Sequence, residues 1–234
     1  AGNSTPDDAL FKVTESGKLY AKDIITSLRE IIVEPGESIQ DAINELESTG
    51  GNVLLSPGLH TITQDIYCKS NVYLTGTGQN TVLDFEYTYN MYLTGDNAYS
   101  EGTVDATFGS DTITGTDTEW LTYAAPGQRI KIGSNWELII DVVSDTEITL
   151  EMPYSGESVT GGQYVVASTI DDVEIKSLNI INLADKLLIQ YGFGMLVYAT
   201  YIASSAGAGF SILDTANSTT EAMYVIGTGG SPTA

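Results

Sequence analysis

The chain has 234 residues, with nine lysines and arginines against 31 aspartates and glutamates, and its formal net charge is −22. So few cations cannot form the basic patch that nucleic-acid binding needs, and they disfavour binding of a polyanion by charge alone. One cysteine and one histidine exclude an intrachain disulfide and a histidine-cluster metal site, and we expect no metal and no cofactor.

Residues 1–28 begin with a polar stretch that gives way to an alternating pattern. Apolar residues alternate with polar ones on both sides of a Ser16-Gly17 turn: Phe11, Val13, Leu19 and Ala21. The pattern predicts a short hairpin, which is marginally stable alone in water. We therefore expect this segment to pair with partner chains. The alternative is an edge hairpin that packs on the next part of the same chain.

Residues 38–47 are predicted to form a helix. Ser38 is a suitable N-cap, and Gly50-Gly51 follows as a helix end that glycine tolerates. The apolar residues are spaced at i, i+3, i+4 and i+7, which places them on one face: Ile39, Ala42, Ile43 and Leu46.

Short apolar runs recur along residues 29–96, one before the predicted helix and the others after it. The runs 53–55, 72–74 and 91–93 start 19 residues apart, and 31–33 starts 22 residues before the first of them. Turn-forming residues separate the runs, and His60 is expected in such a turn at the surface. A fixed period near 20 with Val-, Ile-, Tyr- and Thr-rich units predicts a solenoid of strands, a parallel β-helix.

Residues 97–168 break this period. Alternating runs at 128–132, 137–143 and 147–152 are joined by short turns, which is typical of an antiparallel meander. We predict a small inserted β-barrel here.

The coil pattern returns in residues 169–234. Val173 and Ile175 are expected inside, with Glu174 and Lys176 outside. Residues 187–213 carry no charge, and a membrane helix of about 20 residues would fit within them. Four glycines and scattered polar residues favour further β-helix strands instead, so we expect no membrane contact.

Several of these strings resemble known proteins. "SIQDAINEL", "GGNVLLSPGLHTI", "SNVYLTGTG" and "TVLDF" resemble the first coils of the pectin-lyase-like right-handed parallel β-helix superfamily. That superfamily includes polysaccharide lyases, hydrolases and bacteriophage tailspikes. "LFKV" and "SGKLYAKDI" resemble segments that precede receptor-binding domains of phage tail fibres and spikes, where three chains intertwine, and this resemblance implies a homotrimer. The insert resembles a module of phage structural proteins. The resemblance implies an all-β, right-handed parallel β-helix.

Four carboxylates are candidates for catalysis. If Leu83, Phe85 and Tyr87 face the core, Asp84 and Glu86 project outward together. Asp65, one coil earlier, and Glu174, one coil later, are expected to join them. Two suitably spaced carboxylates supply the acid and base of glycoside cleavage. Chance proximity among 31 acidic residues is the competing explanation, and the coils lack the basic residues of a pectate-type lyase site.

Aromatic residues are candidates for ligand binding, since sugar rings stack on exposed aromatic faces. They gather around the start of the insert and inside it: Tyr87, Tyr89, Tyr92, Tyr99, Trp120 and Trp136. The alternative for the two tryptophans is that they fill the core of the insert.

The sequence therefore predicts a phage tailspike-like attachment protein, at the virion surface or extracellular. Its expected partners are host-surface polysaccharide and other virion proteins. A polysaccharide-degrading enzyme on the same scaffold is the first alternative, and a purely structural fibre component is the second.

Overall fold

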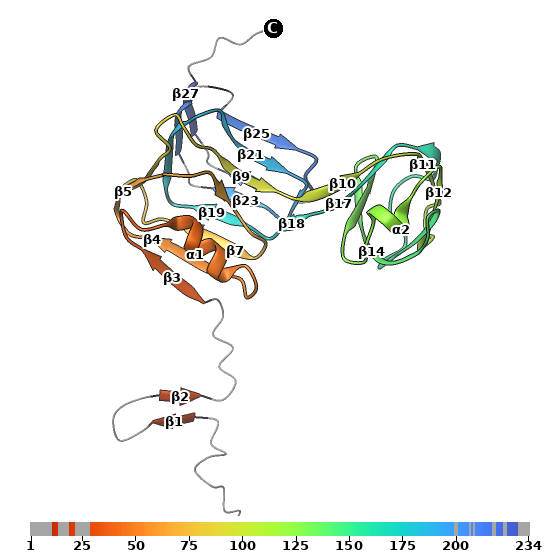
Figure 1. Cartoon of the computed structure of the whole chain (residues 1–234), viewed down its shortest axis with the longest axis horizontal. Helices are drawn as coiled ribbons and strands as arrows, with labels where there is room; N and C mark the ends of the chain where they lie inside the picture. The colour runs from red at the N-terminus through yellow and green to blue at the C-terminus, as the bar shows by residue number, and fades with distance from the viewer. Residues whose placement is uncertain are drawn as a thin grey trace, which may run out of the picture.

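The computed structural model describes residues 29–198 and, outside them, residues 11–13, 19–21, 201–205, 207, 209–216, 219–221 and 224–228. Its main body is a parallel β-helix, in which the chain passes in turn through three parallel sheets (Figure 1). The predicted all-β class and solenoid architecture are confirmed; the right-handed sense of the coils stays a prediction.

Within the described residues the three sheets hold six, five and four strands. The six-stranded sheet contains β3 (Glu30–Val33), β4 (Gly51–Leu55), β7 (Val72–Thr75), β19 (Glu174–Lys176), β23 (Leu196–Tyr198) and β26 (Thr219–Glu221). The five-stranded sheet contains β5 (Gly58–Thr61), β8 (Thr81–Asp84), β20 (Asn179–Leu183), β24 (Tyr201–Ser205) and β27 (Tyr224–Thr228). The four-stranded sheet contains β6 (Ile66–Tyr67), β9 (Met91–Thr94), β21 (Lys186–Gln190) and β25 (Gly209–Leu213). A short parallel pair, β18 (Ile170–Asp171) and β22 (Gly192–Phe193), lies at a corner.

Alternation along the strands builds the core. In β7, Val72 and Leu74 are buried while Tyr73 and Thr75 face outward. In the same way Val173 and Ile175 are buried and Glu174 faces outward, as predicted. His60 corrects a prediction: it is buried on the inward side of β5, where its Nε2 lies 2.9 Å from the Ser56 carbonyl oxygen.

The strand register corrects the predicted 19-residue repeat. Val53 pairs with Leu74, and Ile175 with Val197, so these coils are 21 and 22 residues long. Met91 belongs to the four-stranded sheet and lies in the same coil as Val72, rather than one coil later. The 22-residue spacing between Ile31 and Val53 is a true register pair.

Helix α1 (Ile39–Leu46) forms where the sequence predicts it. The Ser38 hydroxyl accepts a hydrogen bond from the Asp41 amide at 3.2 Å. The apolar face is buried in the same core as the β-helix strands: Ile39, Ala42, Ile43 and Leu46. On its polar side, the Gln40 amide donates to the Tyr67 carbonyl and accepts from the Tyr67 amide, at 3.1 and 2.7 Å. The Gln40 side chain thus satisfies the open edge of β6.

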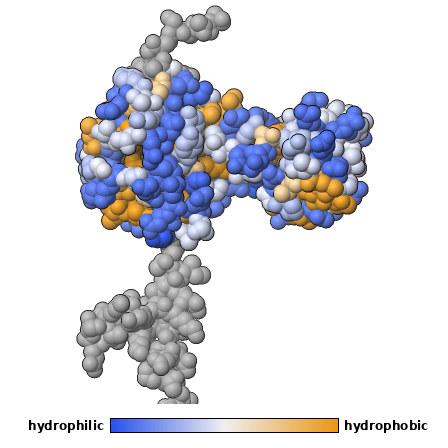
Figure 2. Space-filling view, in the orientation of Figure 1, coloured by the Kyte–Doolittle hydropathy of each residue, from blue (hydrophilic) through white to orange (hydrophobic). Residues whose placement is uncertain are grey.

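Between β9 and β18 the chain forms an antiparallel insert beside the β-helix (Figure 1). As described, it contains β10 (Asp96–Tyr99), β11 (Thr103–Ala106), β12 (Thr112–Thr116), α2 (Trp120–Tyr123), β13 (Arg129–Ile132), β14 (Asn135–Ser144), β15 (Glu147–Leu150), β16 (Val159–Gly162) and β17 (Tyr164–Ser168). The insert has its own core around the fully buried Trp120. Orange, apolar side chains also gather on one side of its surface (Figure 2). Closure into a barrel and the predicted domain boundaries stay predictions.

The coil after the insert stacks directly on the coil before it. Ile175 pairs with Leu74, Ile180 with Leu83 and Ile189 with Leu93. The described part of residues 187–213 forms strands joined by short connections, and none of the described helices has the length and apolarity needed to cross a membrane. Near the N-terminus, β1 (Phe11–Val13) and β2 (Leu19–Ala21) pair antiparallel as predicted. Most of residues 1–28 lie outside the described residues.

Candidate functional site

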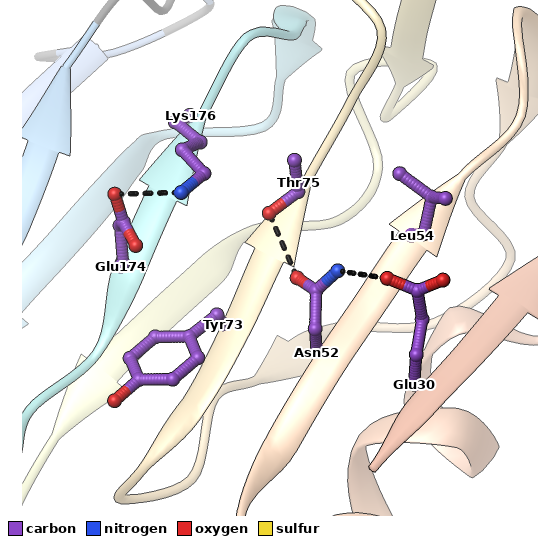
Figure 3. Close-up of a pocket in the computed structure, with 7 residues that line it drawn as sticks. All are labelled: Glu30, Asn52, Leu54, Tyr73, Thr75, Glu174 and Lys176. Atoms are coloured by element: carbon purple, nitrogen blue, oxygen red, sulfur yellow. Dashed lines mark hydrogen bonds and ion pairs between the residues drawn. The ribbon is translucent and has the colours of Figure 1, made fainter. Parts of the chain in front are cut away.

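Outward side chains of the six-stranded sheet form two rows across adjacent strands, because parallel strands in register place equivalent residues side by side. The first row is Glu30, Asn52, Tyr73 and Glu174. The second row is Ile32, Leu54, Thr75 and Lys176. Except for Ile32, the residues of these two rows line an open groove of about 650 Å³ (Figure 3).

Hydrogen bonds fix most of the polar groups in the groove (Figure 3). The Asn52 amide donates to Glu30 Oε2 at 3.0 Å and accepts from the Thr75 hydroxyl at 2.8 Å. Lys176 Nζ lies 3.0 Å from Glu174 Oε1. The half-buried Tyr73 stands between Asn52 and Glu174 in its row. The groove therefore offers one aromatic ring among polar groups that are already oriented.

This arrangement suits a ligand rich in hydroxyl groups that lies across the strands. An aromatic ring accepts the apolar face of a sugar, while the amide, hydroxyl and carboxylate groups exchange hydrogen bonds with its hydroxyls. The two carboxylates are poorly placed for glycoside cleavage. Glu30 and Glu174 stand three strand spacings apart, about 14 Å, whereas glycosidases hold their carboxyl pair about 5 to 9.5 Å apart.

The four predicted catalytic carboxylates do not form one cluster. Asp84 ends β8, and Glu86 follows in the turn toward the four-stranded sheet, close to the corner where Asp65 precedes β6. Glu174 is on the six-stranded sheet, in the groove. The expected single outward face is therefore wrong, because the coil turns a corner between these residues. A catalytic role for any one of them stays a prediction.

The carboxylates at this corner bind the chain itself. Asp84 Oδ1 accepts from the Glu86 amide and from Asn182 Nδ2, each at 2.9 Å. Asp65 Oδ1 accepts from the Asn90 amide at 2.8 Å. These contacts hold the turns between β5 and β6 and between β8 and β9.

Three of the predicted ligand-binding aromatics are buried in the insert. Trp120 is fully buried, and its indole donates to the Tyr164 hydroxyl at 3.1 Å. Tyr99 belongs to the same core, and Trp136 is buried nearby. Their expected exposure is therefore wrong. Tyr99 and Trp120 fill the core of the insert, the predicted alternative for a tryptophan, and Trp136 is buried outside that cluster. Burial raises the pKa of the Tyr164 phenol.

The other three aromatics lie on the β-helix. Tyr89 is half-buried and packs against the core. Tyr87 is 52% exposed, which corrects its expected inward orientation. Both Glu86 and Tyr87 have positive φ, 50° and 56°, so a turn interrupts the alternation at this point. Tyr92 faces outward on β9 and stacks on Tyr67, with the ring centroids 5.0 Å apart.

Sequence reasoning missed most of the groove residues: Glu30, Asn52, Leu54, Tyr73 and Thr75. The available signal was the coil length. A 21-residue step leads from Asn52 to Tyr73, whereas the step from Tyr73 to Glu174 crosses the insert and does not follow this spacing.

The single cysteine is a core residue. Cys68 is buried in the β-helix core. Burial raises the pKa of its thiol to about 12, which leaves it a neutral, apolar core residue rather than a nucleophile.

No protein-family model matches the chain, and no curated protein matches its sequence. Solved structures similar to it include three phage tailspikes. One is the Gp54 tailspike of Acinetobacter baumannii bacteriophage AP22, in complex with A. baumannii capsular saccharide (TM-score 0.44, 11% identity, 81% of this chain and 44% of that chain). The second is tailspike gp61 of Pseudomonas phage phi297 (TM-score 0.42, 13% identity, 80% of this chain and 44% of that chain). The third is tailspike gp49 of Pseudomonas phage LKA1 (TM-score 0.40, 10% identity, 81% of this chain and 41% of that chain). The chain thus spans less than half the length of each.

Proposed function

We propose that this chain is an attachment protein that binds a neutral surface glycan in the groove of the six-stranded sheet without cleaving it. The observation that carries the proposal is the outward row with Tyr73 between Asn52 and Glu174, in a groove of about 650 Å³. The Asn52 amide is held by contacts on both sides, which lowers the entropy lost when a ligand binds.

Charge favours a neutral glycan over an acidic one. The chain carries a net charge of −22, and Lys176, the one cation among the described residues that line the groove, is paired with Glu174. An acidic polysaccharide would meet long-range repulsion that only high salt screens. We therefore expect binding that changes little with ionic strength.

The separation of the groove carboxylates supports binding without cleavage. Glu30 and Glu174 stand about 14 Å apart by strand spacing, and Glu174 is held by Lys176. Neither residue has a second carboxylate within the distance that glycoside hydrolysis uses in the groove as described.

The test is a glycan array that carries neutral and acidic bacterial surface polysaccharides. We expect neutral hits, and we expect Tyr73→Ala to weaken them by about tenfold, the loss that accompanies removal of one aromatic contact. Phe108→Ala is the matched control, since Phe108 is an exposed aromatic of the insert outside the groove. Retention of full binding by Tyr73→Ala, or hits confined to acidic glycans, would contradict the proposal.

Cleavage is tested on the same hits with reducing-end and unsaturated-product assays. We expect no turnover. Turnover that disappears in Asp84→Asn or Glu86→Gln would instead assign a polysaccharide-degrading activity to the corner between the five- and four-stranded sheets.

We further propose that the chain works at a virion surface, as a homotrimer together with other virion proteins. The support is the sequence resemblance to spike segments and the short N-terminal hairpin β1–β2. Sedimentation of the full chain is expected to give a trimer, and removal of residues 1–28 is expected to weaken it. A stable monomer of the full chain at micromolar concentration would contradict this.

A further inference from the structure

A second cavity lies where the β-helix meets the insert. It has a volume of about 350 Å³, within the range of about 300 to 1,000 Å³ that is usual for small-ligand sites. Its wall on the β-helix side carries Tyr67 and Tyr92, and its wall on the insert side carries Asp96 and Ser168. Lys69 and Thr169 also lie on its rim.

The two tyrosines form a rigid pair. Tyr67 and Tyr92 are register partners on adjacent strands, and their rings stack with an interplanar angle of 17°. β6 is the end strand of the four-stranded sheet, so Tyr67 has a strand neighbour on one side and is 50% exposed. The two hydrogen bonds between the Gln40 side chain and the Tyr67 main chain hold that main chain in place. The cavity therefore has a fixed aromatic ring at its wall.

The charged groups of the rim already have partners. Lys69 Nζ lies 2.8 Å from Glu47 Oε1, and Asp96 Oδ1 accepts from Asn97 Nδ2 at 2.8 Å. The Ser168 hydroxyl accepts from Gln128 Nε2 at 3.1 Å and has its own proton to donate. Such a rim favours a ligand that brings hydroxyl groups rather than charge. Burial, with the nearby Asp65 charge, Tyr92 and a hydrogen bond to Asp65, raises the pKa of Tyr67, so its phenol is protonated at neutral pH and adds no charge to the cavity.

This cavity and the groove flank a single corner of the coil. The chain runs from Tyr67 on the four-stranded sheet to Tyr73 on the six-stranded sheet in six residues. Six residues span at most about 21 Å. A polysaccharide of several units that occupies the groove is therefore within reach of the second cavity without leaving the surface.

We propose that the Tyr67–Tyr92 cavity is a second subsite that holds a neutral pyranose unit of the same polysaccharide chain that lies in the groove. This inference rests on the proposed function. The sugar stacks on the exposed Tyr67 ring, and its hydroxyls meet the Ser168 and Thr169 hydroxyls. Occupation of two linked subsites raises the overall affinity without any new contact in the groove.

The experiment is calorimetric titration of the full chain with an oligosaccharide series, from disaccharide upward, prepared by partial hydrolysis of the array-positive neutral polysaccharide. For oligomers long enough to turn the corner, we expect Tyr67→Ala to weaken binding by about five- to tenfold. For the disaccharide, which the groove alone holds, we expect no change. Tyr73→Ala is expected to weaken every length, and Phe108→Ala none.

Two outcomes overturn the subsite, and they differ from failure of the proposed function. Tyr67→Ala binding that equals wild type at every length, with Tyr73→Ala impaired, removes the second subsite and leaves the groove. A Tyr67→Ala loss that is equal for all lengths contradicts a subsite reached only by longer chains. No glycan binding by the wild-type chain removes the groove proposal as well. Tyr67→Phe, which retains the stacked ring, is expected to bind nearly as wild type, and thermal unfolding checks that each variant is folded.

Discussion

The Arg129 guanidinium lies over the Phe193 ring, with its carbon 3.9 Å from the ring centroid. Arg129 is on β13 of the insert and Phe193 on β22 of the β-helix. Arg129 Nη2 is also 3.7 Å from Asp171 Oδ2. Two residues further along β13, Lys131 Nζ lies 2.5 Å from Asp214 Oδ1. Two of the nine cations of the chain thus join the insert to the coils.

We predict that Arg129→Ala destabilises this junction by about 1–2 kcal/mol, the range of a partly desolvated cation–π contact. Arg129→Lys keeps the charge but not the planar stacking, so it should recover only part of the loss. Both tryptophans are in the insert, which makes tryptophan fluorescence during urea unfolding the suitable measurement. Equal stability of Arg129→Ala and wild type would show that the contact contributes nothing.

We predict that the coils fold without the insert. β19, β20 and β21 pair directly with β7, β8 and β9, and Asp96 and Ser168 are register partners where the chain leaves and returns. Replacement of residues 97–168 by a short Gly/Ser linker should preserve a cooperative transition followed by circular dichroism. Loss of that transition would mean that the coils depend on the insert for folding.

Gly95 at the base of the insert is expected to tolerate no side chain. An added Cβ would collide with the Ser168 carbonyl oxygen and approach the Tyr191 Cβ to 3.0 Å. Gly95→Ala should therefore destabilise the protein by about 1–3 kcal/mol, the usual cost of overpacking. Gly109→Ala is a control for loss of glycine in the insert, since nothing lies within 4 Å of its added Cβ, although its φ of 80° adds strain. A Gly95→Ala variant as stable as wild type in urea would contradict the close approach.

Gln40 is expected to protect the edge of β6. Gln40→Ala removes both hydrogen bonds to the Tyr67 main chain, for an expected loss of about 1–2 kcal/mol. Hydrogen exchange of the Tyr67 amide should then accelerate. Asn44→Ala, which removes the 2.8 Å contact with the Gln40 amide but leaves β6 paired, is the control. Unchanged protection of the Tyr67 amide in Gln40→Ala would rule out the edge contact.

The Cys68 thiol is expected to resist labelling in the folded protein. Its pKa is raised to about 12 by burial, so the thiolate that reacts is scarce at pH 8. As pH rises toward that value, or as urea unfolds the chain and returns the pKa to its ordinary range, labelling by a thiol reagent should accelerate. Fast stoichiometric labelling at pH 8 without denaturant would contradict the burial.

Local patterns predicted the elements well, and long-range register was the difficulty. The Ile39–Leu46 helix and the alternating strands β13, β14 and β15 follow from spacing within a few residues. The coil length could not be predicted from such local spacing, because short apolar runs on three different sheets look alike in sequence. The sequence pattern therefore predicts a new coil at Met91, although Met91 lies on another face of the same coil as Val72.

The site was harder to predict than the fold for the same reason. Glu174 was correctly placed outward, but its neighbour Tyr73 is about a hundred residues earlier, across the insert. Tyr87 was expected inside because Leu83 and Phe85 are inside. The left-handed backbone at Glu86 and Tyr87 reverses that orientation, and no glycine or asparagine marks the turn at these two positions in the sequence.

The decisive measurement for glycan binding in the groove is a crystal structure of the chain with a bound neutral oligosaccharide. We expect an intact sugar chain across the six-stranded sheet, with one ring over Tyr73 and hydrogen bonds to Asn52 and Glu174. A sugar bound only on the insert, or a cleaved product at the corner of Asp84 and Asp65, would contradict it.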